Sequence, residues 1–153
     1  RVRILAPVSA HDSVAKTLTM LGITIYKTAL TQGDVGVFDS GSSNQVRIDG
    51  FMDGGQVYAT DVQTTSNSTI DPVQLQGPVT SVDPSSLTFH LLGVRVDLSD
   101  SMDLRGPDES PLTAQQFHDL LAPDVLLDLE DGTWDGSKIT NDAGGPTTIS
   151  FED

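Results

Sequence analysis

Two aspartate-rich segments in the second half of the chain are the first candidates for chemistry, Asp97–Glu109 and Asp124–Asp135. Calcium binds about six to eight oxygen atoms at about 2.3–2.6 Å, commonly from Asp side chains and loop carbonyls. The residues that could supply such a ligand set are Asp97, Asp100, Asp103, Asp131 and Asp135. Neither segment has the spacing of an EF-hand loop. The alternative interpretation is a solvated acidic face whose aspartates form turns.

The remaining polar and aromatic candidates are single residues. Trp134 follows in a predicted hairpin turn, where it could stack on a sugar, anchor a partner, or fold over the mouth of a barrel. The three histidines, His11, His90 and His118, have no spacing typical of a zinc site or a hydrolase, and the chain contains no cysteine. No acid, base and nucleophile stand out as a group, so we expect that the protein is not an enzyme.

The two ends of the chain are a different kind of candidate. Arg1 begins inside an alternating apolar pattern that predicts a strand, and Thr147–Glu152 is a further short alternating strand with no obvious place in its own barrel. An open sheet edge and a spare strand favour pairing between chains, and head-to-tail pairing would build a filament. In the alternative interpretation the tail pairs within its own chain, or a third module has been trimmed away. The residues of the predicted assembly strand are Thr147, Thr148, Ile149, Ser150 and Phe151.

These candidates lie on a pattern that occurs twice. Val2–Ile25 aligns without a gap with Val73–Val96, and an internal repeat of this kind predicts two copies of one module. In each copy the apolar positions of the alternation change phase at a Leu-Gly pair, Leu21-Gly22 in the first and Leu92-Gly93 in the second. A change of phase at a glycine predicts a β-bulge or a sharp coil of one long strand.

Each copy then continues into a predicted hairpin. In the first copy Asp49–Gly55 is the expected turn, and Val57–Val62 is the returning strand. In the second copy a helix over Thr113–Leu121 precedes the hairpin, because Thr113 and Gln116 have the spacing of a capping box. No helix is predicted in the connection of the first copy.

This order of strands, with a connection before the last hairpin, is that of a five-stranded OB-type barrel. We therefore predict a mostly β fold made of two tandem small OB-like β-barrels, with one short helix in the second. The predicted divisions are module 1 over residues 1–63, a linker over 64–71, module 2 over 72–143 and an extra C-terminal strand over 144–153.

The repeated motif has a strand glycine, a Thr-apolar alternation and a Gly-apolar-x-Val ending, followed by a late hairpin turning on Asp-Gly. It resembles a bacterial domain-of-unknown-function family that occurs as tandem OB-like β-barrel repeats in secreted proteins and lipoproteins. The first copy departs from it with Ala6 in place of the glycine, and the second fits better. The family implies a fold and no activity, because it carries no catalytic signature. The matching residues of the second copy are Gly77, Val79, Val82, Leu87, Thr88, Gly93, Val94 and Val96.

Charge and composition restrict the partners. The net charge is −14, and nineteen of the 22 acidic residues are Asp. Residues 1–71 hold five basic and seven acidic groups, a balance of −2, whereas residues 72–153 hold three and fifteen, a balance of −12. Such a surface repels phosphate backbones and anionic lipid, so nucleic acid is not expected. No apolar run approaches the roughly 20 residues of a membrane span, so no membrane insertion is expected.

The sequence thus predicts a non-enzymatic structural or interaction module that can self-assemble through its terminal β-strands, with another copy of the chain as partner. The alternative is a calcium- or glycan-binding accessory domain that uses the Asp-rich loops of module 2 and Trp134. No cofactor is expected other than calcium in that alternative. Scarce lysine, abundant Ser and Thr and the tract Asn67-Ser68-Thr69 favour an extracellular, cell-surface or periplasmic location.

Overall fold

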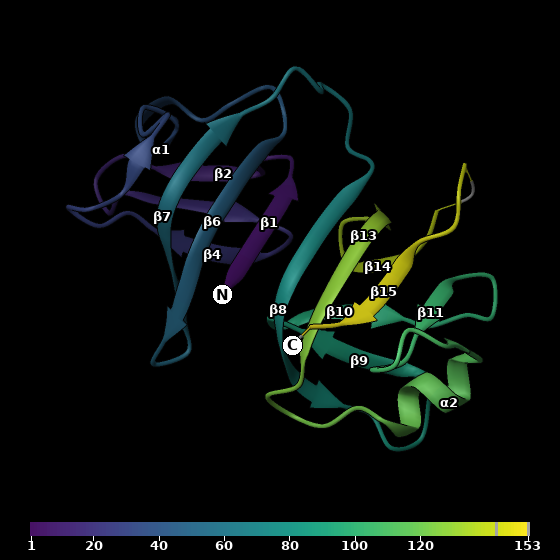
Figure 1. The fold of residues 1–153 in the computed structure, drawn as a ribbon. Helices are drawn as coiled ribbons and strands as arrows, with labels where there is room; N and C mark the ends of the chain where they lie inside the picture. The colour runs from purple at the N-terminus through teal and green to yellow at the C-terminus, as the bar shows by residue number, and fades with distance from the viewer. Residues whose placement is uncertain (143, 153) are drawn as a thin grey trace. The chain divides into compact units, whose positions relative to one another are not determined.

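The computed structural model describes residues 1–142 and 144–152 and is mostly β (Figure 1). The two predicted C-terminal segments end at Ala143 and Asp153, which lie outside the described residues. The chain divides into two compact units, Arg1–Ile70 (unit 1) and Asp71–Asp153 (unit 2). The boundary between them falls inside the segment 64–71 that was predicted as a linker.

Unit 2 contains a closed barrel of five strands. They are β8 (Val73–Val82), β9 (Thr88–Leu91), β10 (Val94–Asp97), β13 (Leu126–Trp134) and β14 (Lys138–Asn141). The antiparallel pairs are β8–β9, β9–β10, β13–β14 and β13–β8, and β10 pairs with β14 in parallel. The ring closes because β13 lies between β14 and β8, which confirms the predicted OB-like order.

Additional elements surround this barrel. They are β11 (Asp103–Arg105), β12 (Pro111–Leu112), α2 (Ala114–Asp119) and β15 (Thr148–Phe151). The capping box that predicted the helix is present: the Thr113 side chain accepts a hydrogen bond from the Gln116 backbone, and the Gln116 side chain accepts one from Thr113.

Unit 1 has the same strand order with its first strand interrupted. Its elements are β1 (Val2–Ala6), β2 (Ala10–Asp12), β3 (Thr17–Met20), β4 (Ile23–Tyr26), β5 (Gln32–Gly33), α1 (Val37–Ser40), β6 (Val46–Asp53) and β7 (Gln56–Thr64). β1 pairs with β6 and β2 with β3, and β4 pairs in parallel with β7. β6 and β7 form the last hairpin, and β5 adds to β7.

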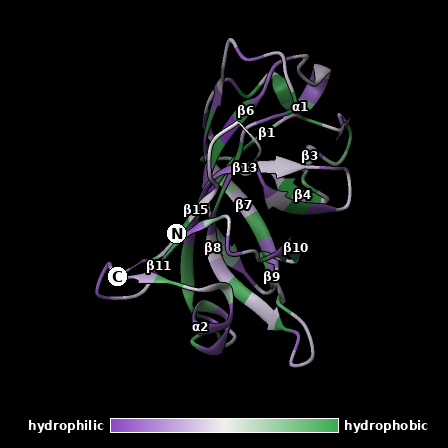
Figure 2. Ribbon diagram, turned by 90° about the vertical axis from the view of Figure 1, so that its right-hand side faces the viewer, coloured by the Kyte–Doolittle hydropathy of each residue, from purple (hydrophilic) through white to green (hydrophobic). Residues whose placement is uncertain are grey.

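The alternation of apolar residues produces the core of each barrel. Figure 2 shows hydrophobic and hydrophilic residues alternating along strands such as β6. The buried residues of the unit 1 barrel are Val2, Ile4, Ala6, Leu18, Met20, Ile23, Ile25, Val46, Ile48, Val57, Ala59 and Val62. Within the described part of the chain, no helix has the length and apolar character needed to cross a membrane.

The change of phase at the Leu-Gly pairs has another cause than the predicted bulge. Met20 lies opposite Ile23, and Leu21 and Gly22 form a two-residue hairpin turn with φ of 54° and 75°. Leu92 and Gly93 do the same with φ of 51° and 78°. Such turns require positive φ at both central residues. The flanking residues are directly paired and share a face, so the alternation shifts by one position; the prediction of one long strand was wrong.

Two further differences concern unit 1. Its connection contains the single helical turn α1, which the sequence did not predict because its N-cap, Gly36, makes no side-chain cap. The burial of Val37 and Phe38 stabilises this turn instead. The last hairpin turns at Gly54-Gly55, both with positive φ, so the strand β6 runs through most of the segment that was predicted as a turn.

Candidate functional site

The aspartates predicted to bind calcium are not gathered into one ligand set. Within residues 1–142 and 144–152, no group of three or more His, Cys, Asp or Glu residues could hold a metal ion. Asp97 forms ion pairs with Arg95 at 2.8 Å and Lys138 at 2.9 Å. Its partial burial favours a higher pKa, but the hydrogen bonds and charges of Arg95 and Lys138 outweigh this and lower the pKa of Asp97.

The other four candidate carboxylates lie in separate local arrangements. Asp103 pairs with Arg105 at 2.8 Å. Asp100 accepts a hydrogen bond from the Ala114 N–H at the start of α2. Asp135 accepts backbone N–H groups from the turn that follows it, with that of Ser137 having the largest effect in lowering its pKa. Asp131 is exposed, with φ of 58°. These roles fit the turn-forming acidic face more closely than a calcium site.

Trp134 occupies the end of β13 rather than a turn. It is half-buried, is paired with Ile139, and its backbone N–H donates to the Asp71 carboxylate at 2.9 Å. Its indole is therefore not a fully exposed platform for a ligand.

The predicted assembly strand has partners within unit 2. β15 pairs with β13 in antiparallel fashion and with β11 in parallel fashion. Ile149 is fully buried, and the Phe151 ring lies 5.2 Å from that of Phe117. Thr147 is also buried, and its hydroxyl donates to the Asp131 carbonyl oxygen at 2.8 Å. The strand that seemed to lack a place in its own barrel thus has one, as in the alternative interpretation.

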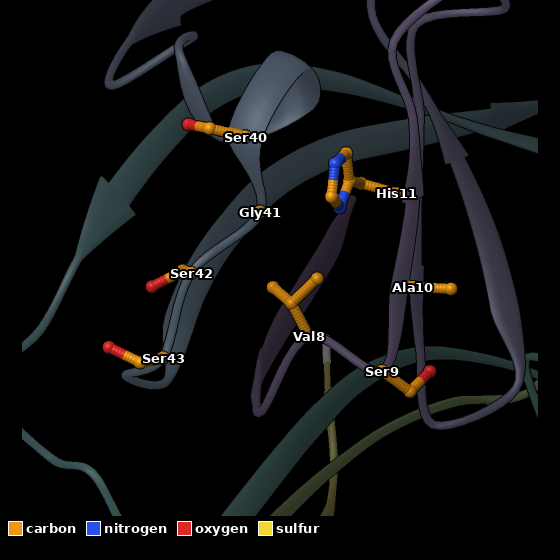
Figure 3. A pocket seen from close by; sticks show the side chains of 8 residues that line it. All are labelled: Val8, Ser9, Ala10, His11, Ser40, Gly41, Ser42 and Ser43. Carbon is orange, nitrogen blue, oxygen red and sulfur yellow. The ribbon is translucent and has the colours of Figure 1, made fainter.

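A pocket of about 340 Å³ lies in unit 1 between the segment 8–11 and the segment 40–43 (Figure 3). The His11 imidazole points toward Gly41, where a Cβ would lie 2.9 Å from Nδ1. Ser40 and Ser42 donate their hydroxyls to backbone carbonyl oxygens. None of the hydrogen bonds described for the residues lining the pocket joins His11 to a serine, so no base and nucleophile are paired there.

Another surface of unit 1 consists of three aromatic rings on three neighbouring strands. Tyr26 lies on β4, Tyr58 on β7 and Phe51 on β6, and we call these three residues the aromatic ladder. Tyr58 is central in the register, opposite both Tyr26 and Phe51. The ring centroids lie 5.7 Å apart for Tyr26–Tyr58 and 5.5 Å apart for Phe51–Tyr58. The rings point outward, since the neighbours of Tyr58, Val57 and Ala59, are buried.

Gln56 holds the two tyrosines of the ladder in place. The Tyr58 hydroxyl donates to Gln56 Oε1 at 2.7 Å, and Gln56 Nε2 donates to the Tyr26 hydroxyl oxygen at 3.4 Å. Phe51 has no such polar tie and is 43% exposed. The ladder is therefore an ordered aromatic surface with neutral hydrogen-bonding groups beside it.

The corresponding face of unit 2 has ions in place of rings. Extending the gap-free alignment by one residue places Asp97 at the position of Tyr26. The parallel pairing of β10 with β14 matches that of β4 with β7 and places Lys138 at the position of Gln56 and Thr140 at that of Tyr58. Asp97 and Lys138 form an ion pair, and Thr140 lies opposite Thr133. The aromatic ladder is thus a property of unit 1 alone.

Residues 6–63, which include the whole ladder, match the family model described as Domain of unknown function (DUF5666). The match covers less than half of the chain and lies in unit 1, whereas the sequence pattern predicted the better fit in the second copy. The matched residues lie in unit 1, which has the same strand order as the five-stranded barrel of unit 2. Comparison with curated proteins and with solved structures finds no significant match.

Proposed function

We propose that this chain is a non-enzymatic interaction module that acts in an extracellular, cell-surface or periplasmic setting, with the aromatic ladder as its binding surface. The observation that carries the proposal is the outward-facing row formed by Tyr26, Tyr58 and Phe51, in which Phe51 is exposed and the two tyrosines are half-buried. Both tyrosines of the chain are in this row. Tyrosine rings supply a large contact area with few rotatable bonds, so they contribute strongly to binding.

The ordering of the ladder supports this role. Binding is weakened when flexible side chains must be immobilised. Tyr26 and Tyr58 are already tied through Gln56, and Tyr58 is flanked by a ring on each side. A ligand would therefore meet a surface that is arranged before it arrives.

In this proposal the two units are tandem copies of one module that have diverged in their surfaces. Unit 1 binds the ligand, and unit 2 supplies a stable, strongly acidic body. Assembly through the terminal strand is supported less well, because β15 would have to leave both β11 and β13 to pair with another chain. Calcium binding by unit 2 is likewise supported less well, because Asp97, Asp103 and Asp135 already have local partners.

The test is an NMR titration of the isotope-labelled full chain with three classes of probe: neutral oligosaccharides, a single-stranded oligothymidylate and an unstructured peptide. We expect amide shift changes centred on β4, β6 and β7 with one class. The Tyr58→Ala variant should lose these changes, and Thr140→Ala, at the corresponding position of unit 2, should keep them. Shift changes confined to unit 2, or none with any probe, would show that the proposal is wrong.

A further inference from the structure

We infer that the aromatic ladder binds an uncharged oligosaccharide chain, an inference that rests on the proposed function. The ladder has two kinds of surface. Aromatic faces lie at the ends of the row, and the two tyrosine hydroxyls and Gln56 form a polar edge. A pyranose ring has complementary surfaces, because one face carries polarised C–H groups and the edge carries hydroxyls. The electron-rich face of an aromatic ring attracts positively polarised hydrogens.

The ends of the ladder are the expected stacking positions. Tyr58 has a neighbouring ring on each side. The aromatic faces available to a ligand are therefore the outer faces of Tyr26 and Phe51, which point away from Tyr58. Phe51 is the more exposed of the two, with Tyr26 half-buried. A sugar that stacks on Phe51 removes apolar surface from water, which is favourable as long as its hydroxyls keep hydrogen-bond partners.

The polar groups beside the rings suit a neutral ligand. Gln56 can both donate and accept through its amide, and each tyrosine hydroxyl can donate and accept as well. Thr24 and Thr60 are exposed on the same strands as the tyrosines. These groups match sugar hydroxyls, which also donate and accept, and none of them supplies the full charge that a phosphate or carboxylate would require.

Charge disfavours nucleic acid as the ligand. Proteins that stack single-stranded bases on aromatic rings also line the path with cations. The strands β3, β4 and β7 contain no Lys or Arg, and the one basic residue of β6, Arg47, lies 3.7 Å from Asp49. Lys27 directly follows Tyr26, and its ammonium donates to the Thr28 carbonyl oxygen at 3.5 Å, so a single lysine rather than a line of cations adjoins the ladder there. Asp53 is the exposed charge nearest in sequence to Phe51 and would repel a phosphate.

Strand pairing disfavours an extended peptide as the ligand. A peptide commonly adds to an open sheet edge through main-chain hydrogen bonds. At the two tyrosines no edge is open, because β4 lies between β3 and β7, and β7 lies between β4 and β6. β6 pairs with β1 only as far as Gly50, so this pairing does not extend to Phe51. A ligand over Tyr26 and Tyr58 therefore meets side chains alone, which suits a sugar chain lying across the strands.

The test measures the affinity of the full chain for cellohexaose and maltohexaose by calorimetry, with hexagalacturonate, oligothymidylate and a neutral unstructured peptide as competing classes. We expect binding of a neutral hexasaccharide and a loss of about tenfold or more in affinity for Phe51→Ala. Tyr26→Phe, which keeps the ring, should lose only a few-fold. Thr133 pairs with Thr140 in unit 2 as Phe51 pairs with Tyr58 in unit 1, so Thr133→Ala is the matched control and should bind like the parent. Melting curves establish that each variant is folded.

The outcomes separate this inference from the proposed function. If the peptide or the oligothymidylate binds and Phe51→Ala weakens it, the ladder is a binding surface but the oligosaccharide inference is wrong. If only hexagalacturonate binds, the inference of an uncharged ligand is wrong. If no probe binds, or if a sugar binds equally well to Phe51→Ala and Tyr26→Ala, both statements are wrong.

Discussion

At the scale of single residues, many of the acidic groups act on their own turns. Asp12, Asp34, Asp83 and Asp135 each accept hydrogen bonds from neighbouring or facing backbone N–H groups, and these bonds have the largest effect in lowering the pKa of each carboxyl. The pKa of Asp108 is lowered first by the Ser110 hydroxyl and then by the Ser110 backbone N–H. A carboxylate that is stabilised in the folded state resists protonation. Asp12, Asp83, Asp108 and Asp135 thus stabilise their own turns, whereas Asp34 binds Thr64 on β7.

The dependence of stability on pH follows from the lowered pKa of Asp97. Its folded-state pKa lies below the ordinary value of 3.8, so its stabilising contribution is complete above that pH and is lost as the pH falls below 3.8 through the folded pKa. We expect the free energy of unfolding of Asp97→Asn to fall less steeply with decreasing pH below about 4 than that of the parent. Urea unfolding at a series of pH values measures this slope.

A matched variant locates the cause of that slope. Arg95→Gln removes one of the two cations beside Asp97 and keeps the carboxylate, so it should reduce the same slope partly. If both variants keep the slope of the parent, the ion pairs of Asp97 do not contribute to acid stability.

At the scale of elements, the two-residue turns show how a fold can depend on unusual positions. Leu21 and Leu92 have positive φ, which is unfavourable for a leucine, yet both are buried. A Cβ on Gly77 would lie 2.8 Å from Leu92 Cδ1, so Leu92 packs directly over the glycine of β8. The burial of the side chain offsets the cost of its backbone conformation.

The C-terminal strand β15 packs within its own unit, and this packing is testable. Ile149 is fully buried between β11 and β13. We expect Ile149→Ala to destabilise the protein by about 2–5 kcal/mol, as measured by chemical denaturation. Leu120→Ala is the control, because Leu120 is 48% exposed, and it should cost much less. Equal stability of Ile149→Ala and the parent would mean that β15 does not pack in its own unit.

At the scale of the whole molecule, the pairing of β15 and the net charge of −14 favour separate chains over assembly. We expect light scattering to give a solution mass near 16.2 kDa, with no change on dilution. Long regular polymers in negative-stain images would contradict this expectation and would indicate strand exchange between chains. As a control, a variant lacking Thr147–Asp153 should be no less monomeric and should be less stable.

The sequence by itself determined the class of fold. The repeat of Val2–Ile25 in Val73–Val96, with its period-two alternation, predicted the two strand patterns, and the Thr113–Gln116 capping box predicted α2. Local patterns are sufficient for such features because alternation and capping act between residues close in sequence. The Leu-Gly turns were missed because leucine is rare at positive φ, so the usual Asn-Gly or Asp-Gly signal was absent.

Only the tertiary structure decided which residues form a surface. Tyr26 and Tyr58 become neighbours through the parallel pairing of β4 with β7, and no local pattern specifies the register of two strands so far apart in sequence. The predicted calcium ligands are likewise all aspartates, but the fold does not bring them together at one place. The physical reason is that a site depends on register between distant segments, whereas a strand depends on its own alternation.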